Sequence, residues 1–332
     1  MSLDFLYREY ESGDETSIVA TFNKVFEPIH EGFVPRTIEE WRWQFAANPS
    51  GHRIFLATTE EGQVVSQFAG LGQRARLDGE ACSFVHGVDS FTDPSFRGGL
   101  KRPGHFIKTA QGFVDRFLGA DRDVMMWGFP VWQAWRIGQR FLKEEMVRSQ
   151  HALTLDADDY RLEAAAGVDV EEVERFPDEV DELFERSVPE HGAIQVRDAA
   201  HLNWRFSERP GTNYRIALAR RAGSLVGYAV YRADGFDGRP AGLLCDWLVP
   251  GSDRVVGHAL RNFLIDCARA EDQPRLIGVF PDYCAEWVNF QRARWIVEPS
   301  LYFVVARSFH RGVDVPWLRS RWYYTLGDTD LC

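Results

Sequence analysis

Residues 39–65 of the chain read EEWRWQFAANPSGHRIFLATTEEGQVV, and residues 200–227 read AHLNWRFSERPGTNYRIALARRAGSLVG. When Trp43 is aligned with Trp204, the same offset of 161 positions aligns four further pairs of identical residues. These pairs are Phe45 and Phe206, Pro49 and Pro210, Gly62 and Gly223, and Val65 and Val226. The two stretches favour an internal repeat. A chance likeness between two apolar, aromatic patterns is the competing interpretation.

Further matches follow both stretches in the same order along the chain. They are Asp89 and Asp246, Gly104-His105 and Gly257-His258, and Phe129-Pro130 and Phe280-Pro281. The distance between successive matches is shorter in the second copy, as expected when a duplicated domain loses loop residues. The order of the matches therefore predicts one fold encoded twice.

The bulk composition limits the class of protein. A chain of 332 residues exceeds the roughly 250–300 residues at which a single hydrophobic core stops growing, so two domains are expected. The formal charge of −11 disfavours a nucleic acid or an anionic membrane as partner, since both need clustered Lys and Arg. No apolar stretch is long enough for a membrane span, and the first residues do not resemble a secretory signal. Five scattered cysteines without a CxxC pair indicate a reducing compartment, so we expect a cytoplasmic protein of unspecified oligomeric state.

Both copies show the same predicted order of elements. Each has an amino-terminal strand, two helices, a run of antiparallel strands, and then a strand–helix–strand–helix–strand series. This order predicts an α/β fold of two tandem domains, each a mixed, mostly antiparallel sheet flanked by helices. We place the domains at residues 1–160 and 167–310, with an acidic linker between them and an aromatic tail at residues 311–332.

The first copy contains a glycine-rich, basic loop before its third predicted helix. Residues 96–106 read FRGGLKRPGHF, with three cations (Arg97, Lys101 and Arg102) in an otherwise acidic protein. Backbone amides at a helix N-terminus attract anions, and glycines let phosphate oxygens approach the backbone. In the second copy the corresponding segment carries Asp253, which would repel a phosphate. The loop therefore predicts a diphosphate site in the first copy only, against the alternative of an ordinary charged surface loop.

With this loop in this position, the chain resembles the GNAT superfamily of acyl-CoA-dependent N-acyltransferases, as a tandem duplicated GNAT-like protein. Arg97, Gly98 and Gly99 match the start of the family pattern Arg/Gln-x-x-Gly-x-Gly/Ala, and the residues LKRP then depart from it. The resemblance implies acetyl-CoA or another acyl-CoA as co-substrate of the first copy, with the second copy degenerate and either structural or substrate-shaping. The implied cofactor-binding residues are Ser90, Phe91, Arg97, Gly98, Gly99, Lys101, Arg102, Gly104, His105 and Phe106.

Attack of an amine on a thioester is assisted by a group that accepts the ammonium proton and by an acid that protonates the departing thiolate. Asp89, on the fourth predicted strand, is the candidate catalytic base, and a salt-bridging role is its alternative. His86 is expected on the other face of a regular strand, as a packed structural residue. The tyrosine acid that the resemblance implies is missing, because the segment GFPVWQAWRIG has tryptophans there instead.

The tail RWYYTLGDTDLC (residues 321–332) is too aromatic for a disordered end, so we expect it to pack on a domain. Asp328 and Asp330 are candidates for the acceptor site, against the alternative of a simple Gly-Asp turn. The predicted substrate residues are Trp132, Tyr323 and Asp328. No metal site is predicted, since the nine histidines are dispersed and no cysteines are paired in sequence.

The leading hypothesis is an N-acyltransferase that transfers an acyl group, most simply acetyl, from CoA to an amine of a small molecule or amino-sugar. Direct attack on the thioester requires no covalent enzyme intermediate. A non-catalytic tandem GNAT-like binding protein is the alternative. An aminoacyl-tRNA-dependent transferase is a weaker one, because the acidic charge disfavours tRNA.

Overall fold

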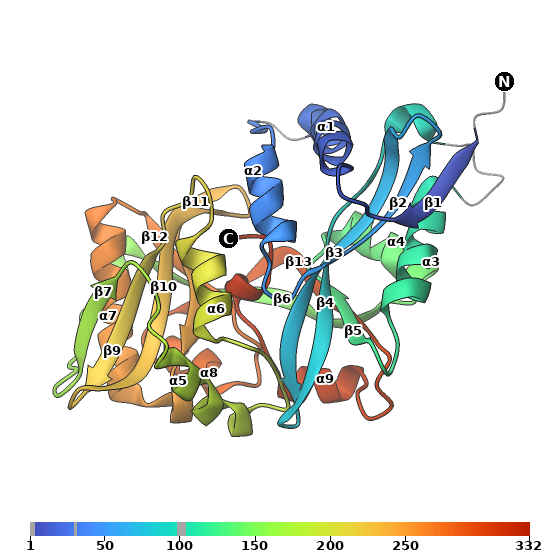
Figure 1. The fold of residues 1–332 in the computed structure, drawn as a ribbon. Coiled ribbons are helices and arrows are strands. Elements are labelled where there is room, and N and C mark those ends of the chain that lie inside the picture. The colour runs from blue at the N-terminus through green and yellow to red at the C-terminus, as the bar shows by residue number, and fades with distance from the viewer. Residues whose placement is uncertain (1–3, 30–31, 98–103) are drawn as a thin grey trace.

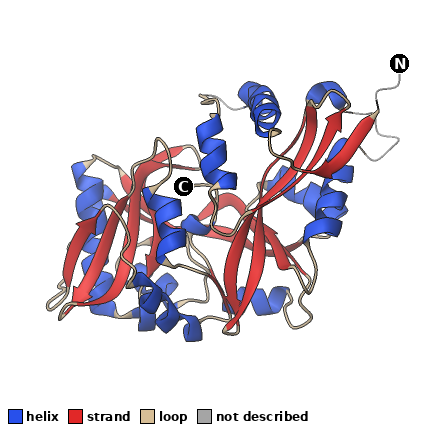
Figure 2. Ribbon diagram, viewed as in Figure 1, coloured by secondary structure: helices blue, strands red, loops and turns tan. Residues whose placement is uncertain are grey.

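The structure is a computed structural model that describes residues 4–29, 32–97 and 104–332. Over these ranges the strands form one continuous sheet, and helices pack along it (Figures 1 and 2). The strand order is β1-β2-β3-β4-β5-β13-β6-β12-β11-β10-β9-β7, with β8 pairing with β3 and β14 with β8. Most neighbouring pairs are antiparallel, which confirms the predicted mixed, mostly antiparallel α/β architecture.

The first half of the chain runs from β1 to β6. Its strands are β1 (Phe5–Glu9), β2 (His52–Thr59), β3 (Val64–Leu77), β4 (Glu80–Thr92), β5 (Asp123–Gly128) and β6 (Glu145–Asp156). Its α-helices are α1 (Glu15–Phe26), α2 (Ile38–Trp41), α3 (His105–Phe117) and α4 (Trp132–Leu142).

The second half runs from β7 to β13 and repeats this order, with one additional strand, β8, between its first two α-helices. Its strands are β7 (Asp169–Val173), β8 (Ala193–Gln195), β9 (Arg215–Arg221), β10 (Ser224–Phe236), β11 (Arg239–Leu248), β12 (Arg275–Gly278) and β13 (Ile296–Ser308). Its α-helices are α5 (Val180–Ser187), α6 (Ala199–Leu202), α7 (Arg254–Ala270) and α8 (Ala285–Arg292). The tail adds α9 (Val315–Arg321) and β14 (Trp322–Tyr323).

The two repeated stretches form the same local structure. Thr37 caps α2 in a capping box with Glu40, and the Asp198 side chain caps α6 by accepting a hydrogen bond from the His201 amide. Each short helix then widens into a π-helical turn, at residues 42–46 and 203–207. Both turns end shortly before a proline, Pro49 or Pro210, because the residue that precedes proline is excluded from the helical region.

The alternation of β3 divides the core of the first half between the two faces of the sheet. Ala69 packs in a cluster with residues of α1 and α2, including Ile18 and Trp41. Phe68 lies in a separate cluster with Phe113 of α3. Successive side chains of a strand point to opposite faces, so α1–α2 and α3–α4 cover different sides of the sheet.

The two halves exchange their last strands. β13 of the second half lies between β5 and β6 of the first, and pairs antiparallel with both. β6 in turn pairs with β12 and β13 of the second half. The single sheet therefore depends on both halves.

In each half two parallel strands pair briefly and then separate. β4 and β5 pair from Ser83 and Asp123 to His86 and Trp127. β11 and β12 pair only over Gly242–Leu244 and Leu276–Gly278. The structure therefore contains two similar gaps in the sheet, one in each half.

The C-terminal tail occupies the gap in the second half, and the chain ends between the two halves (Figure 1). The Tyr323 hydroxyl donates to the Trp247 carbonyl at 2.6 Å. Gly327 lies so close to β11 that a Cβ on it would be 3.0 Å from the Cys245 carbonyl oxygen. The corresponding gap between β4 and β5 contains a cavity.

Candidate active site

A cavity of about 500 Å³ lies where β4 and β5 separate. This volume is typical of a small-molecule site. Aromatic side chains form much of its wall: Phe22, Phe26, Phe33, Phe68, Phe106, Trp127 and Phe129. Three carboxylates also line it, those of Asp89, Glu144 and Asp330. Desolvation in an apolar cavity raises a carboxyl pKa towards neutrality, as it does for Glu144, and such a carboxyl suits proton transfer.

Asp89 reaches the cavity because β4 bulges at this residue. The register with β3 shifts between Ala69–Val88 and Gln67–Phe91, and Asp89 has a left-handed φ of 50°. Its carboxylate forms an ion pair with Arg36 and accepts a hydrogen bond from Gln44 Nε2 at 3.1 Å. Asp89 thus has both features considered from the sequence, a place in the cleft and a salt bridge.

Asp330 comes from the tail and faces His86 of β4. The His86 Nε2 atom lies 3.3 Å from Asp330 Oδ1. His86 is 1% exposed and packs on the Trp127 ring, with centroids 4.2 Å apart. Burial opposes ionisation of Asp330, but the hydrogen bond from His86 and the charges of His86 and Arg36 outweigh it and lower the pKa of Asp330. The Asp330 side chain is still 43% exposed, so it remains accessible to a ligand.

Glu144 lies on the α4 side of the cavity and was not expected from the sequence. Burial raises the pKa of its carboxyl to about 7, against the opposing charge of Arg307. The carboxylate lies over Gly138 of α4, where a Cβ would be 1.9 Å from Glu144 Oε2. Nothing in the local sequence FLKEEMV distinguishes Glu144 from the exposed Glu145, so only the tertiary packing identifies it.

The predicted CoA loop is described at its two ends only. Gly98, Gly99, Lys101 and Arg102 lie outside the described residues. Arg97, at the near end, has its Nε atom 3.4 Å from the Thr92 carbonyl oxygen.

At the far end of the loop, Gly104 is the N-cap of α3. The first helical residue, His105, contacts β1 through a 2.8 Å hydrogen bond between its Nδ1 atom and the Tyr7 hydroxyl. Burial and the charge of Lys108 lower the pKa of His105, which favours its neutral form. The next residue, Phe106, lines the cavity and contacts Phe68. The N-terminus of α3 therefore lies beside the cavity, as a phosphate-binding role requires.

The two predicted CoA contacts on β4 differ in position. Ser90 lines the cavity. Phe91 is 3% exposed and packs in the core against Phe22, with ring centroids 6.3 Å apart. Any contribution of Phe91 to CoA binding is therefore through its backbone or through packing.

The three predicted substrate residues are not among those that line the cavity. Trp132 is half-exposed and packs on Trp135 and Phe303. Tyr323 is buried in the gap of the second half. Asp328 is buried in an ion pair with Arg197 at 2.6 Å, and burial raises its pKa against the charge of Arg197. Their roles towards substrate stay predictions, whereas the other aspartate of the same tail, Asp330, lines the cavity.

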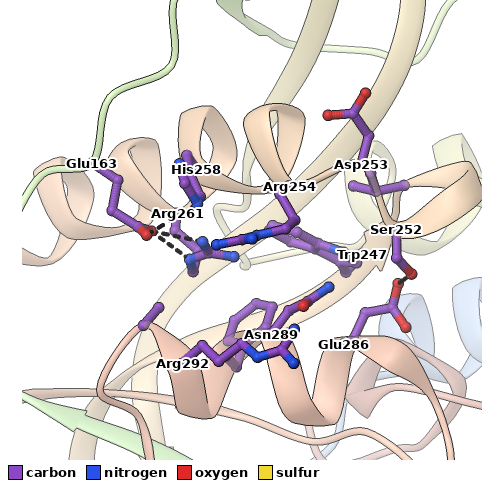
Figure 3. Close-up of a pocket in the computed structure, with 14 residues that line it drawn as sticks. Glu163, Trp247, Ser252, Asp253, Arg254, His258, Arg261, Glu286, Asn289 and Arg292 are labelled. Carbon is purple, nitrogen blue, oxygen red and sulfur yellow. Dashed lines mark hydrogen bonds and ion pairs between the residues drawn. The ribbon is translucent and has the colours of Figure 1, made fainter.

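The second half lacks a free helix N-terminus at the corresponding position. Asp253 caps α7 by accepting hydrogen bonds from the Val255 amide at 2.9 Å and the Val256 amide at 3.2 Å. It also pairs with Arg221 at 2.7 Å. The amides that could bind a diphosphate are thus already satisfied by a carboxylate. A smaller pocket remains between α7 and α8 (Figure 3).

Comparison with known proteins identifies the fold. We find no match to a protein-family model and none to a curated protein sequence. A probable N-acyltransferase from Enterococcus faecalis V583 has a similar structure, with a TM-score of 0.68, 14% identity, and coverage of 93% of this chain and 73% of that one. A GCN5-related N-acetyltransferase from Anabaena variabilis gives a TM-score of 0.66 at 12% identity, covering 92% of this chain and 73% of that one.

The chain therefore has the fold of the GCN5-related N-acetyltransferases, as the sequence predicts. A tandem GNAT protein from the clavulanic acid biosynthesis pathway is similar over its whole length. The match covers 94% of this chain and 100% of that one, with a TM-score of 0.58 at 14% identity. The GNAT fold is thus present twice in one chain.

Two further findings concern the described residues alone. None of their helices is both long enough and apolar enough to cross a bilayer. They also contain no group of three or more His, Cys, Asp or Glu side chains arranged to hold a metal ion.

Proposed function

We propose that the protein is an acyl-CoA-dependent N-acyltransferase, with acetyl-CoA as the first candidate donor and an amine of a small molecule or amino-sugar as acceptor. The observation that carries the proposal is the cavity between the separated ends of β4 and β5. It combines apolar walls, three carboxylates and the N-terminus of α3. The second half, with Asp253 on its helix N-terminus and the tail in its gap, supports the site rather than repeating it.

The first half contains the features that an acyl-CoA requires. The α3 N-terminus and the cations of the preceding loop suit the diphosphate, since charge-assisted contacts to phosphate are among the stronger polar interactions. The thioester then extends into the aromatic cavity, which excludes water. The structural neighbours with this fold are a probable N-acyltransferase and a GCN5-related N-acetyltransferase, which supports an acyl-CoA as co-substrate.

The carboxylates at the β4 end suit a cationic acceptor. Asp89 and Asp330 both line the cavity, with Arg36 paired to the first and His86 hydrogen-bonded to the second. An ammonium group held by these carboxylates loses a proton to one of them, and the amine nitrogen then attacks the thioester carbonyl. The N–C bond forms, the C–S bond breaks, and the CoA thiolate leaves, while the nitrogen releases its second proton to a carboxylate or to water.

Glu144 is our candidate for the acid that protonates this thiolate, in place of the tyrosine that α4 lacks. A carboxyl with a pKa of about 7 is partly protonated at neutral pH, which is the state that a general acid needs.

The test is release of free CoA from acetyl-CoA across a panel of small amines and amino-sugars, together with calorimetric titration of CoA. We expect amine-dependent turnover, and loss of CoA binding when Arg97 and Lys101 are both changed to Glu. Binding without turnover would instead identify a non-catalytic binding protein. If CoA does not bind and no amine supports turnover, the proposal is overturned.

A further inference from the structure

The pocket between α7 and α8 contains three arginines that the proposed reaction does not use. Arg254 and Arg261 come from α7, and Arg292 comes from the last turn of α8. Their side chains lie between Glu163 on one side of the pocket and Glu286 on the other (Figure 3). The cavity volume of this pocket is about 80 Å³. Since about 10–15 Å³ admits one water molecule, this space admits several waters or one small oxyanion.

Arg261 is the centre of this cluster, and Glu163 engages only two of its three guanidinium nitrogens. Its side chain is 5% exposed, and Nε and Nη2 both contact Glu163, at 2.8 and 2.7 Å. In the part of the chain that the structure describes, its third nitrogen, Nη1, has no hydrogen-bond acceptor. Burial and the nearby charge of Arg254 lower the pKa of Arg261 despite Glu163. Nη1 therefore remains available to a ligand in the pocket, which also contains the carboxylates of Asp253 and Glu286.

Two further arginines line the pocket, and Glu163 has a second partner. The carboxylate of Glu163 is shared, because it also contacts His258 Nε2 at 3.2 Å. Arg254 and Arg292 are exposed at the mouth of the pocket, and within the described ranges neither forms an ion pair. Two further carboxylates line the pocket: Asp253 pairs with Arg221 at 2.7 Å, and Glu286 accepts a hydrogen bond from Ser252 Oγ at 2.8 Å.

We propose that this pocket binds one small oxyanion, a phosphate or carboxylate group of a metabolite, between Arg254, Arg261 and Arg292. The site is distinct from a CoA diphosphate site because Asp253 occupies the helix amides that a diphosphate would need. The planar guanidinium of Arg261 can donate from Nη1 while Glu163 keeps the other two nitrogens, and planar guanidinium groups bind phosphate and carboxylate well.

The experiment is calorimetric titration of inorganic phosphate, and separately of acetate, into the full chain at low ionic strength. We expect saturable binding of at least one anion, and the comparison of the two distinguishes a phosphate site from a carboxylate site. Changing Arg254 and Arg292 together to Ala should weaken this binding at least tenfold. Both residues are exposed, so unchanged thermal unfolding should confirm that the variant is folded.

Two control variants separate this site from general charge effects. Arg136→Ala with Arg311→Ala removes the same charge from exposed positions outside the pocket and should leave anion binding unchanged. Arg97→Ala with Lys101→Ala removes charge from the CoA loop, so it should remove only the phosphate that binds to this loop and leave binding at the pocket. The proposal is overturned if neither anion binds saturably, or if the Arg136/Arg311 variant weakens binding as much as the Arg254/Arg292 variant does. It is also overturned if only the Arg97/Lys101 variant abolishes binding. None of these results depends on acyltransferase activity.

Discussion

Trp43 and Trp204 donate hydrogen bonds to each other's backbone. The Trp43 Nε1 atom lies 2.7 Å from the Trp204 carbonyl oxygen, and Trp204 Nε1 lies 2.8 Å from the Trp43 carbonyl oxygen. The two rings stack with centroids 5.4 Å apart and an interplanar angle of 20°. Reciprocal contacts between equivalent residues are the mark of a two-fold interface. The repeat found in the sequence thus corresponds to an approximate two-fold axis between the halves.

This pair predicts coupled losses of stability. Trp43→Phe or Trp204→Phe leaves one part-buried carbonyl without its donor, which costs up to about 1–3 kcal/mol. Because the rings also stack on each other, the double variant should differ from the sum of the single variants by at least about 0.5 kcal/mol. Urea unfolding measures the free energy of unfolding of the two single variants and the double variant. Trp132→Phe is the control, since that half-exposed side chain should change stability by less than about 0.5 kcal/mol. Strict additivity of the two interface substitutions would contradict the coupling.

The exchange of β6 and β13 predicts that neither half folds alone. A fragment of residues 1–160 lacks β13, so β5 and β6 lose the strand that joins them. Unpaired strand edges promote aggregation. We therefore expect this fragment to be insoluble or unfolded by circular dichroism, and co-expression with residues 161–332 to restore a soluble complex. A monomeric, cooperatively folded fragment would show that the exchange is dispensable.

The sequence predicts the fold well because the fold depends on local patterns. Trp43 and Trp204 mark equivalent turns, and the alternation of β3 and the caps of α2 and α6 are visible in single stretches. The exchange of β6 and β13 could not be predicted, since antiparallel pairing with the other half needs no distinctive residue.

The site was predicted less completely, because much of it depends on contacts between distant segments rather than on local patterns. Asp89 could be proposed from the sequence because it lies within a recognisable strand. Glu144 and the His86–Asp330 contact depend on packing between segments distant in sequence, and the 244 positions that separate His86 from Asp330 leave no local signal.

Substitution of the two tail aspartates should affect different properties: stability for Asp328 and activity for Asp330. Asp328→Asn breaks a buried ion pair with Arg197, and removal of one partner of such a pair costs about 3–5 kcal/mol. Asp330→Asn keeps the shape of an accessible side chain and should cost less than about 1 kcal/mol, yet lower amine-dependent CoA release at least tenfold. Chemical unfolding and a thiol-release assay measure the two effects. If both variants are fully folded and lose activity equally, the proposed role of Asp330 in the reaction is contradicted.

Glu144 should make the protein less stable as pH rises. Below pH 4.5, the ordinary pKa of the carboxyl, both folded and unfolded states carry the proton. Between pH 4.5 and about 7 the unfolded state releases it first, so the free energy of unfolding falls, by at most about 3 kcal/mol. Glu144→Gln has no charge to bury, so its stability relative to wild type should increase across this window. Urea unfolding at pH 5 and pH 8 measures the difference, and Glu145→Gln, at an exposed position, should show none.

Gly138→Ala tests Glu144 without touching its chemistry. The added Cβ would lie 1.9 Å from Glu144 Oε2, so the carboxylate must move, while Ala favours the helix by about 1 kcal/mol over Gly. We expect stability within about 1 kcal/mol of wild type and a kcat at least tenfold lower, because a displaced acid no longer reaches the thiolate. The double variant with Glu144→Gln should be no slower than Glu144→Gln alone, since both substitutions remove the same group. If the fold losses in kcat of the two single variants multiply in the double variant, Gly138 affects catalysis by a route other than Glu144.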